Sequence, residues 1–295
     1  MGSVSPTDSV PARGTASTLD RDAFTLLATH GRLPGQSVEL RFVPVHDLQR
    51  QRVTTFFCTP VSDASAAQGY QAFQNVGARE LPFIDRAILA HAVKFARKLA
   101  GAGTVAAIGT SVHFETLASP KGCEIYQHAL EAAGVADHPF LILNIEEVPA
   151  GAAAVRLIEA AVSAVRGHVK RIFLRLPNNE TSVLPCGHLG ISGLTLALPP
   201  QATRVVAMGV AKWLVRECEA QSAHSCIDRI DSEETLELMT LAGIHFGAGP
   251  VFGPEEFRGD ARPEDVEAYL TEHNRAETGE RRKSSNPDVA EHLQA

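Results

Sequence analysis

Two carboxylates, Asp228 and Asp231, lie three positions apart at the end of the apolar run HSCIDRID. Paired carboxylates can share acid–base work or bind a divalent cation through hard oxygen ligands. Asp231 also directly precedes Ser232 and a helical pattern, and a short polar side chain is typical of a helix start. We therefore interpret the pair first as the end of a strand and the start of a helix.

Thiol and imidazole groups are the other candidates for chemistry among the five cysteines and twelve histidines. Cys186 and His188 share one segment, and His224 and Cys226 share one strand pattern, but no spacing supplies the four ligands of a structural zinc site. Cys58 ends an apolar run without a histidine paired to it by sequence, which favours a small core residue over a nucleophile. The absence of any C-x-x-C pair predicts reduced thiols and a cytoplasmic location.

Composition excludes several classes of partner. The chain has 295 residues, of which 44% are hydrophobic and 21% charged, as in globular proteins. Its net charge of -7 is spread over interspersed acidic and basic residues, so neither nucleic acid nor an anionic membrane surface is an expected partner. No apolar run approaches the roughly 18 residues of a membrane span.

Three regions follow from the hydrophobic pattern. Residues 1–18 are rich in Ser, Thr, Pro and Gly, and we expect a disordered tail there. Residues 19–257 carry regular apolar patterning and predict the folded domain. Residues 258–295 form a charged tail in which Pro263 could begin a short helix.

Eight apolar, β-branched runs predict strands, and most are followed by a helical pattern. The runs lie at residues 38–45, 53–59, 104–110, 139–145, 171–176, 193–198, 224–228 and 244–246. Strands that alternate with helices indicate a parallel α/β protein, and eight strands indicate a (β/α)8 barrel. Only seven residues separate the first two runs, too few for a helical crossover, so these two strands must pair antiparallel.

This arrangement resembles the EAL family, the cyclic di-GMP phosphodiesterase domains of bacterial signalling proteins. VELRFVPVHDLQRQRV is similar to the family's opening hairpin, and FIDRAILAHAVKFARKL is similar to its first long helix. IDRIDSEETLELMTLAGIHFGAGPVFGP is similar to its closing segment. The resemblance covers residues 19–257 and implies a TIM-like barrel of EAL type with one antiparallel strand.

The resemblance also implies where the active site would lie. The family's reaction uses two divalent cations held by carboxylates and an asparagine. We align the family's motif residues to this sequence one by one. The Glu of the Glu-Ala-Leu motif, for which the family is named, falls on Phe57. The phosphate-binding Arg falls on Val61, and the metal-binding Asn falls on Gly109. The first Glu of the fourth-strand motif falls on Asn144, and the second is retained as Glu147.

Most of the remaining aligned positions also differ from the family's residues. The paired Asp of the family falls on Arg175 and Leu176, which puts a cation where the family has two anions. The closing acids fall on Asp228 and Asp231, and the Gln that follows falls on Ala248. The catalytic Lys falls within residues 195–197, none of which is basic.

These replacements predict a non-catalytic, EAL-like regulatory protein that acts through an unidentified protein partner and needs no cofactor. Neither hydrolysis nor tight binding of cyclic di-GMP is expected. A non-hydrolysing cyclic di-GMP receptor is the alternative, although the Arg and Gln that such relatives keep are replaced. Pro185, Gly187 and Gly190 interrupt the segment that, in active family members, is a loop and helix coupling the metals to a dimer interface, so the oligomeric state stays open.

Overall fold

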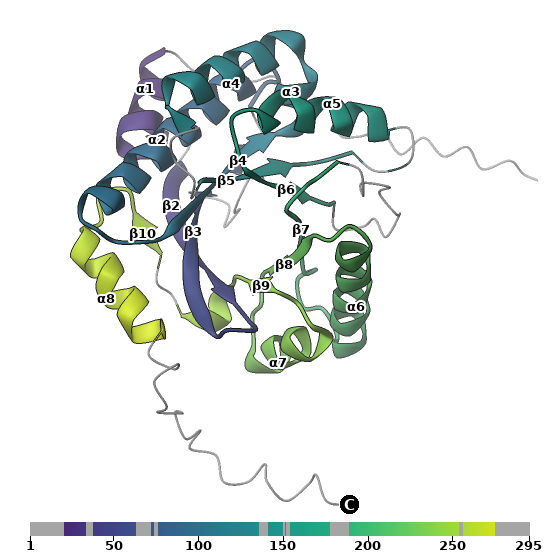
Figure 1. Ribbon diagram of the computed structural model, residues 1–295. Helices are drawn as coiled ribbons and strands as arrows, with labels where there is room; N and C mark the ends of the chain where they lie inside the picture. The colour runs from purple at the N-terminus through teal and green to yellow at the C-terminus, as the bar shows by residue number, and fades with distance from the viewer. Residues whose placement is uncertain are drawn as a thin grey trace, which may run out of the picture.

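The computed structural model describes residues 21–33, 38–62, 72–73, 76–135, 141–149, 151, 154–177, 189–253 and 256–274. Within these residues, eight strands follow one another in chain order and close into a ring (Figure 1). They are β2 (Val38–Asp47), β3 (Arg52–Ser62), β4 (Ala107–His113), β5 (Leu141–Glu146), β6 (Arg171–Arg175), β7 (Gly193–Ala197), β8 (His224–Asp228) and β9 (Phe246–Gly247). The predicted eight-stranded α/β barrel is confirmed.

The first two strands of the ring form an antiparallel hairpin, as their short connection predicts. Val43 lies opposite Phe57 in this pairing, and Gln51 completes the turn with φ of 52°. The strands from β3 to β9 pair in parallel. β2 is therefore the reversed strand, and it closes the ring by pairing antiparallel with β9.

Helices surround the ring (Figure 1). They are α1 (Arg21–His30), α2 (Leu81–Gly101), α3 (Phe114–Ala118), α4 (Pro120–Ala132), α5 (Val155–Arg166), α6 (Arg204–Ala220) and α7 (Glu233–Ala242). In α2, apolar residues recur on one stripe that faces the strands and is buried, namely Ile84, Ile88, Ala92 and Phe95. Ser232 caps the start of α7, where its side chain accepts a hydrogen bond from the Thr235 amide, and Gly243, with φ of 85°, caps the end.

Two separate hydrophobic clusters result from the alternation of side chains along the strands. The larger one lies between the ring and the helices. The smaller one lines the inside of the ring and consists of Val45, Ala107, Ile142, Phe173, Cys226 and Ala248, with Phe57 and Phe246 packed against it. We call this smaller cluster the luminal cluster.

The packed fold extends beyond residue 257, where the sequence pattern placed its end. Two short strands, β1 (Arg32–Leu33) and β10 (Phe257–Arg258), pair with β2. The helix predicted from Pro263 is present as α8 (Pro263–Asn274), which lies beside β10 and the β2–β3 hairpin (Figure 1). Its Val266 and Tyr269 side chains are buried in the larger cluster. The predicted tail at residues 1–18, and residues 275–295, lie outside the described residues.

Three further expectations concern a helix, a membrane span and the cysteines. The segment around Pro185 and Gly187, where no regular helix is expected, lies outside the described residues. None of the helices in the described part of the chain combines the length and apolar composition of a membrane span. Within the described residues, Cys58, Cys123, Cys218 and Cys226 form no disulfide.

Candidate functional site

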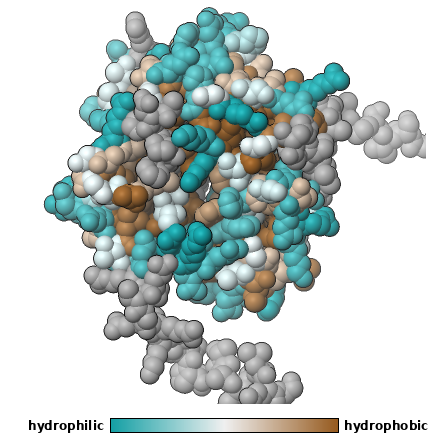
Figure 2. Space-filling view, viewed as in Figure 1, coloured by the Kyte–Doolittle hydropathy of each residue, from teal (hydrophilic) through white to brown (hydrophobic). Residues whose placement is uncertain are grey.

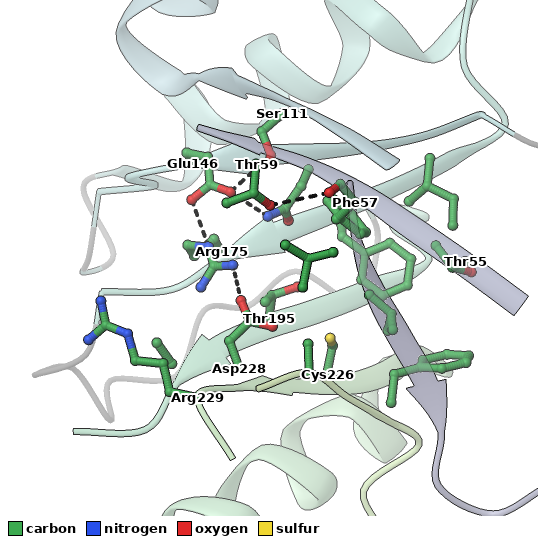
Figure 3. A pocket seen from close by; sticks show the side chains of 18 of the residues that line it. Thr55, Phe57, Thr59, Ser111, Glu146, Arg175, Thr195, Cys226, Asp228 and Arg229 are labelled. Carbon is green, nitrogen blue, oxygen red and sulfur yellow. Dashed lines mark hydrogen bonds and ion pairs between the residues drawn. The ribbon is translucent and has the colours of Figure 1, made fainter. Parts of the chain in front are cut away.

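One pocket of about 2630 Å³ runs through the barrel and is lined by residues from both ends of the strands. The carboxyl ends of the parallel strands meet at one opening, which we call the mouth. (β/α)8 barrels keep their chemistry at this end. Phe57, Ser111, Glu146, Arg175 and Asp228 come from five different strands and line this opening (Figure 3).

Arg175 lies between two carboxylates at the centre of the mouth. Its Nε donates to Glu146 Oε2 at 2.7 Å, and its Nη2 donates to Asp228 Oδ2. Figure 3 shows the guanidinium bridging the two acids, which come from β5 and β8. The Glu146 side chain is only 6% exposed, whereas Arg175 and Asp228 are about a quarter exposed, at 26% and 25%. The arrangement is an internal ion pair that opens to solvent on the Asp228 side.

Glu146 is held by two more donors. Ser111 Oγ donates to its Oε1 at 3.1 Å, and Asn144 Nδ2 donates to the same oxygen at 2.6 Å. Burial raises the pKa of the Glu146 carboxyl, and Arg175 offsets part of that rise. Burial lowers the pKa of the Arg175 guanidinium, but Asp228 and Glu146 together raise it above its usual value. The cluster therefore stabilises a charged Arg175.

The acid at the centre of the mouth is Glu146, which was not among the residues predicted for the site. Glu147, the acid that the resemblance to EAL domains picked out, is exposed and has φ of 56°. Side chains alternate along a strand, so Asn144 and Glu146 face the same side of β5. Counting in steps of two from Asn144 would have identified Glu146.

Aromatic rings fill part of the barrel interior, and one of them, Phe57, stands at a predicted site position. Phe57 and Gly109 are direct partners in the β3–β4 pairing, and a Cβ atom added to Gly109 would lie 2.5 Å from the Phe57 ring. Phe173 and Gly193 are partners in the β6–β7 pairing, and the same contact recurs there. Each ring thus lies over a glycine that leaves room for it.

The other predicted positions fall into different environments. Val61 is buried and lies opposite Glu39 in the β2–β3 pairing, and Leu176 belongs to the larger hydrophobic cluster. Ala248 lies in the luminal cluster. Asp231 is exposed and accepts a 3.4 Å hydrogen bond from the Thr235 hydroxyl at the start of α7, as the sequence predicts. The same interpretation was incomplete for Asp228, which binds Arg175.

Residues of the mouth do not fit the two-cation site that the resemblance to EAL domains implies. A divalent cation needs several free oxygen ligands. The Glu146 carboxylate already accepts three donors, Asp228 is paired with Arg175, and Phe57 offers no ligand atom. Among the described residues no group of three or more His, Cys, Asp or Glu side chains is placed to hold a metal ion.

Charge around the mouth is net negative. Five carboxylates and two arginines of the described residues line this end of the pocket, which gives a formal charge of -3. The carboxylates are Glu115, Glu146, Glu147, Asp228 and Asp231, and the arginines are Arg175 and Arg229. Figure 3 shows the Arg229 guanidinium pointing away from the Arg175 cluster. In the space-filling view, hydrophilic side chains lie on both sides of the central hollow, with hydrophobic ones exposed between them (Figure 2).

Thiol and zinc chemistry find no support in the described residues. Cys58 is 1% exposed in the larger cluster, and burial raises the pKa of its thiol well above the usual range. Cys226 faces the lumen while its neighbour on the strand, His224, is exposed. Cys186 and His188 lie outside the described residues. The interpretation of Cys58 as a core residue is confirmed.

Comparison with solved structures identifies the fold. The EAL domain of Mycobacterium smegmatis DcpA matches with a TM-score of 0.57 and 14% identity over 81% of this chain and 98% of that chain. The Xanthomonas citri FimX EAL domain, in complex with c-diGMP, matches with a TM-score of 0.58 and 15% identity over 80% and 92%. The PaMucR phosphodiesterase in its c-di-GMP complex matches with a TM-score of 0.60 and 15% identity over 80% and 98%. No protein-family model and no curated protein matches the sequence. The chain has the fold of EAL domains.

Proposed function

We propose that this protein is a non-catalytic EAL-type barrel that acts in regulation through contact with another protein, with neither hydrolysis nor tight binding of cyclic di-GMP. The observation that carries the proposal is the Arg175 guanidinium bonded to both Glu146 and Asp228. In this position it occupies the carboxylates that a divalent cation would need. Loss of the cations removes the groups that activate water and screen phosphate charge.

Electrostatics support the absence of tight nucleotide binding. Cyclic di-GMP carries two phosphate charges, and a mouth with a formal charge of -3 repels it. Each charge-assisted hydrogen bond that the site fails to make forgoes about 1.5–3 kcal/mol of binding free energy. Several such losses move a micromolar ligand beyond the millimolar range.

A cyclic di-GMP receptor is the second candidate. Two observations favour it, namely the two arginines in the mouth and the c-diGMP complex of the FimX EAL domain. Binding through Arg175 would require the guanidinium to leave two carboxylates, one of them buried. This cost places the receptor second.

Two assays on the full chain separate these functions. We expect no linear product from cyclic di-GMP with Mg²⁺ or Mn²⁺, with an active EAL phosphodiesterase as the positive control. Metal-dependent product that disappears in Glu146→Gln would overturn the non-catalytic assignment. In calorimetry we expect no saturable binding at micromolar nucleotide. Micromolar affinity that is lost in Arg175→Gln or Arg229→Gln would establish the receptor instead.

Partner contact is tested separately. Crosslinking of the full-length protein in its native cells, followed by mass spectrometry, should recover crosslinks to a second protein species. If the protein yields only crosslinks within its own chain, the role in protein contact is wrong.

A further inference from the structure

The end of the barrel opposite the mouth carries the opposite charge. Here the amino ends of the parallel strands and the β2–β3 turn surround the pocket. Its charged lining consists of Asp47, Arg50, Arg52 and Arg171, three arginines against one aspartate. This gives a formal charge of +2 among the described residues, compared with -3 at the mouth. We call this end the basic opening.

Two of these arginines have no protein partner in the described part of the chain. Arg50 is occupied, because its amide and its Nη1 donate to the Asp47 carboxylate at 2.9 and 3.4 Å. The side chains of Arg52 and Arg171 make no hydrogen bond or ion pair with the described residues, and Arg52 Nε is buried without any acceptor. A buried donor without an acceptor costs free energy. Both guanidinium groups are therefore available to pair with an anion.

Arg171 points into the barrel rather than away from it. Arg171, Phe173 and Arg175 alternate along β6 and all line the pocket. Their neighbours Ile172 and Leu174 belong to the larger cluster outside the ring. Arg52 begins β3, and its side chain lines the same pocket. β3 and β6 are three strand spacings apart, roughly 14 Å along the wall, and long arginine side chains from both can reach one ligand across the lumen.

Behind the basic opening the pocket wall is apolar. The six members of the luminal cluster each retain 6–7% exposure although they lie inside the ring. This residual exposure shows that the six side chains line an open space inside the ring as well as contacting one another. Phe246 of β9 contributes an aromatic face near this end. Eight-stranded barrels can hold one small ligand in their interior.

We propose that the basic opening binds a small amphiphilic anion, with its anionic head between Arg52 and Arg171 and its apolar body in the lumen against the luminal cluster. Guanidinium groups pair with carboxylate and phosphate heads through parallel hydrogen bonds. The apolar body gains by leaving water for the luminal wall. The site uses no residue of the mouth and does not depend on the function proposed above.

Calorimetry on the full-length protein with four probes tests the proposal. Octanoate and octyl phosphate combine head and body, whereas octanol lacks the charge and acetate lacks the body. We expect saturable 1:1 binding of octanoate or octyl phosphate, and the comparison of the two decides which head is preferred. Octanol and acetate should each bind at least tenfold more weakly than the preferred probe.

Charge variants locate the site. Arg171→Gln and Arg52→Gln should each weaken binding of the preferred probe at least tenfold. Arg156→Gln, which removes an exposed charge from α5, should leave binding unchanged. Equal binding by Arg171→Gln and Arg156→Gln would overturn the proposal, as would non-saturable uptake of several probe molecules per chain.

A luminal variant tests the apolar body. Ala107→Leu fills part of the lumen, so it should weaken octanoate binding while acetate binding stays the same. Its melting temperature shows whether the variant folds. If Ala107→Leu does not fold, the two arginine variants still decide the outcome.

Discussion

Replacing Arg175 with methionine removes the cation that holds the mouth together, and we expect a loss of stability at pH 7. Methionine has similar length and no charge, so the change removes two charge-assisted bonds, one to Glu146 and one to Asp228. Removing one partner of a buried ion pair costs about 3–5 kcal/mol. Arg175 and Asp228 are about a quarter exposed, and solvent screens their interaction. We therefore expect a loss of about 2–3 kcal/mol.

Unfolding in urea, followed by circular dichroism, measures this loss. For a protein of this size, 1 kcal/mol corresponds to a shift of roughly 2–4 °C in the melting temperature. The variant should therefore melt roughly 4–12 °C below the wild type. Arg171→Met is the matched control, because Arg171 lies on the same strand and its guanidinium has no partner among the described residues. It should change stability by no more than about 0.5 kcal/mol.

Acid should reduce the defect of Arg175→Met. Burial already raises the pKa of Glu146, and Arg175 counteracts that rise. Without Arg175 the folded-state pKa rises further above the unfolded value, so the folded state binds more protons than the unfolded state. Stability then increases as pH falls toward the unfolded pKa. The difference from wild type should therefore be smaller at pH 5 than at pH 7.

Divalent cations provide a second readout. In Arg175→Met the Glu146 and Asp228 carboxylates and the Asn144 amide are left without a cation, and Asn144 Oδ1 has no hydrogen-bond partner. Millimolar Mn²⁺ should raise the melting temperature of this variant and leave that of the wild type unchanged. The reasoning fails if Arg175→Met is as stable as wild type at pH 7, or if Mn²⁺ stabilises both proteins equally.

Two further predictions concern single side chains. Phe57→Glu should restore no hydrolysis of cyclic di-GMP, because one returned ligand does not rebuild a site that acts as a unit. Phe57→Glu should also lower stability by about 2 kcal/mol, because the ring packs in the lumen. The control Phe57→Leu should lose less than about 1.5 kcal/mol. An unchanged melting temperature for Phe57→Glu would contradict this. Burial and then His273 lower the pKa of His46 to about 4. The unfolded state therefore binds more protons below pH 6.5, and stability should fall by about 3 kcal/mol between pH 6.5 and pH 4. His46→Phe retains the stacking on Phe252 and should flatten this dependence in urea titrations; equal acid sensitivity in both proteins would show that His46 is not responsible.

Local patterns in the sequence were enough to predict the barrel. Alternation of β-branched runs with helical stripes placed all eight strands, because a strand or helix must bury one face and so repeats its apolar residues with a fixed period. The short connection before Val53 determined the reversed strand, because chain length alone forbids a crossover there. The resemblance also singled out Arg175 and Asp228, which the structure brings together in the mouth.

Tertiary structure decided what these residues do. Arg175, Glu146 and Asp228 come from β6, β5 and β8, and only closure of the ring brings them together. Glu146 and Glu147 are adjacent acids in sequence. The end of β5 and the positive φ of Glu147 determine which one enters the mouth.

The basic opening and the packing of α8 also depend on residues that are far apart in sequence and meet only in the folded chain. Asn274, 221 positions after Val53, donates to its carbonyl oxygen and accepts from its amide. Arg52 and Arg171 line one opening although more than a hundred residues separate them in sequence. Composition and periodicity predict which face of a helix or strand is buried. The partner on that face is chosen by strand register and ring closure, which are properties of the folded chain.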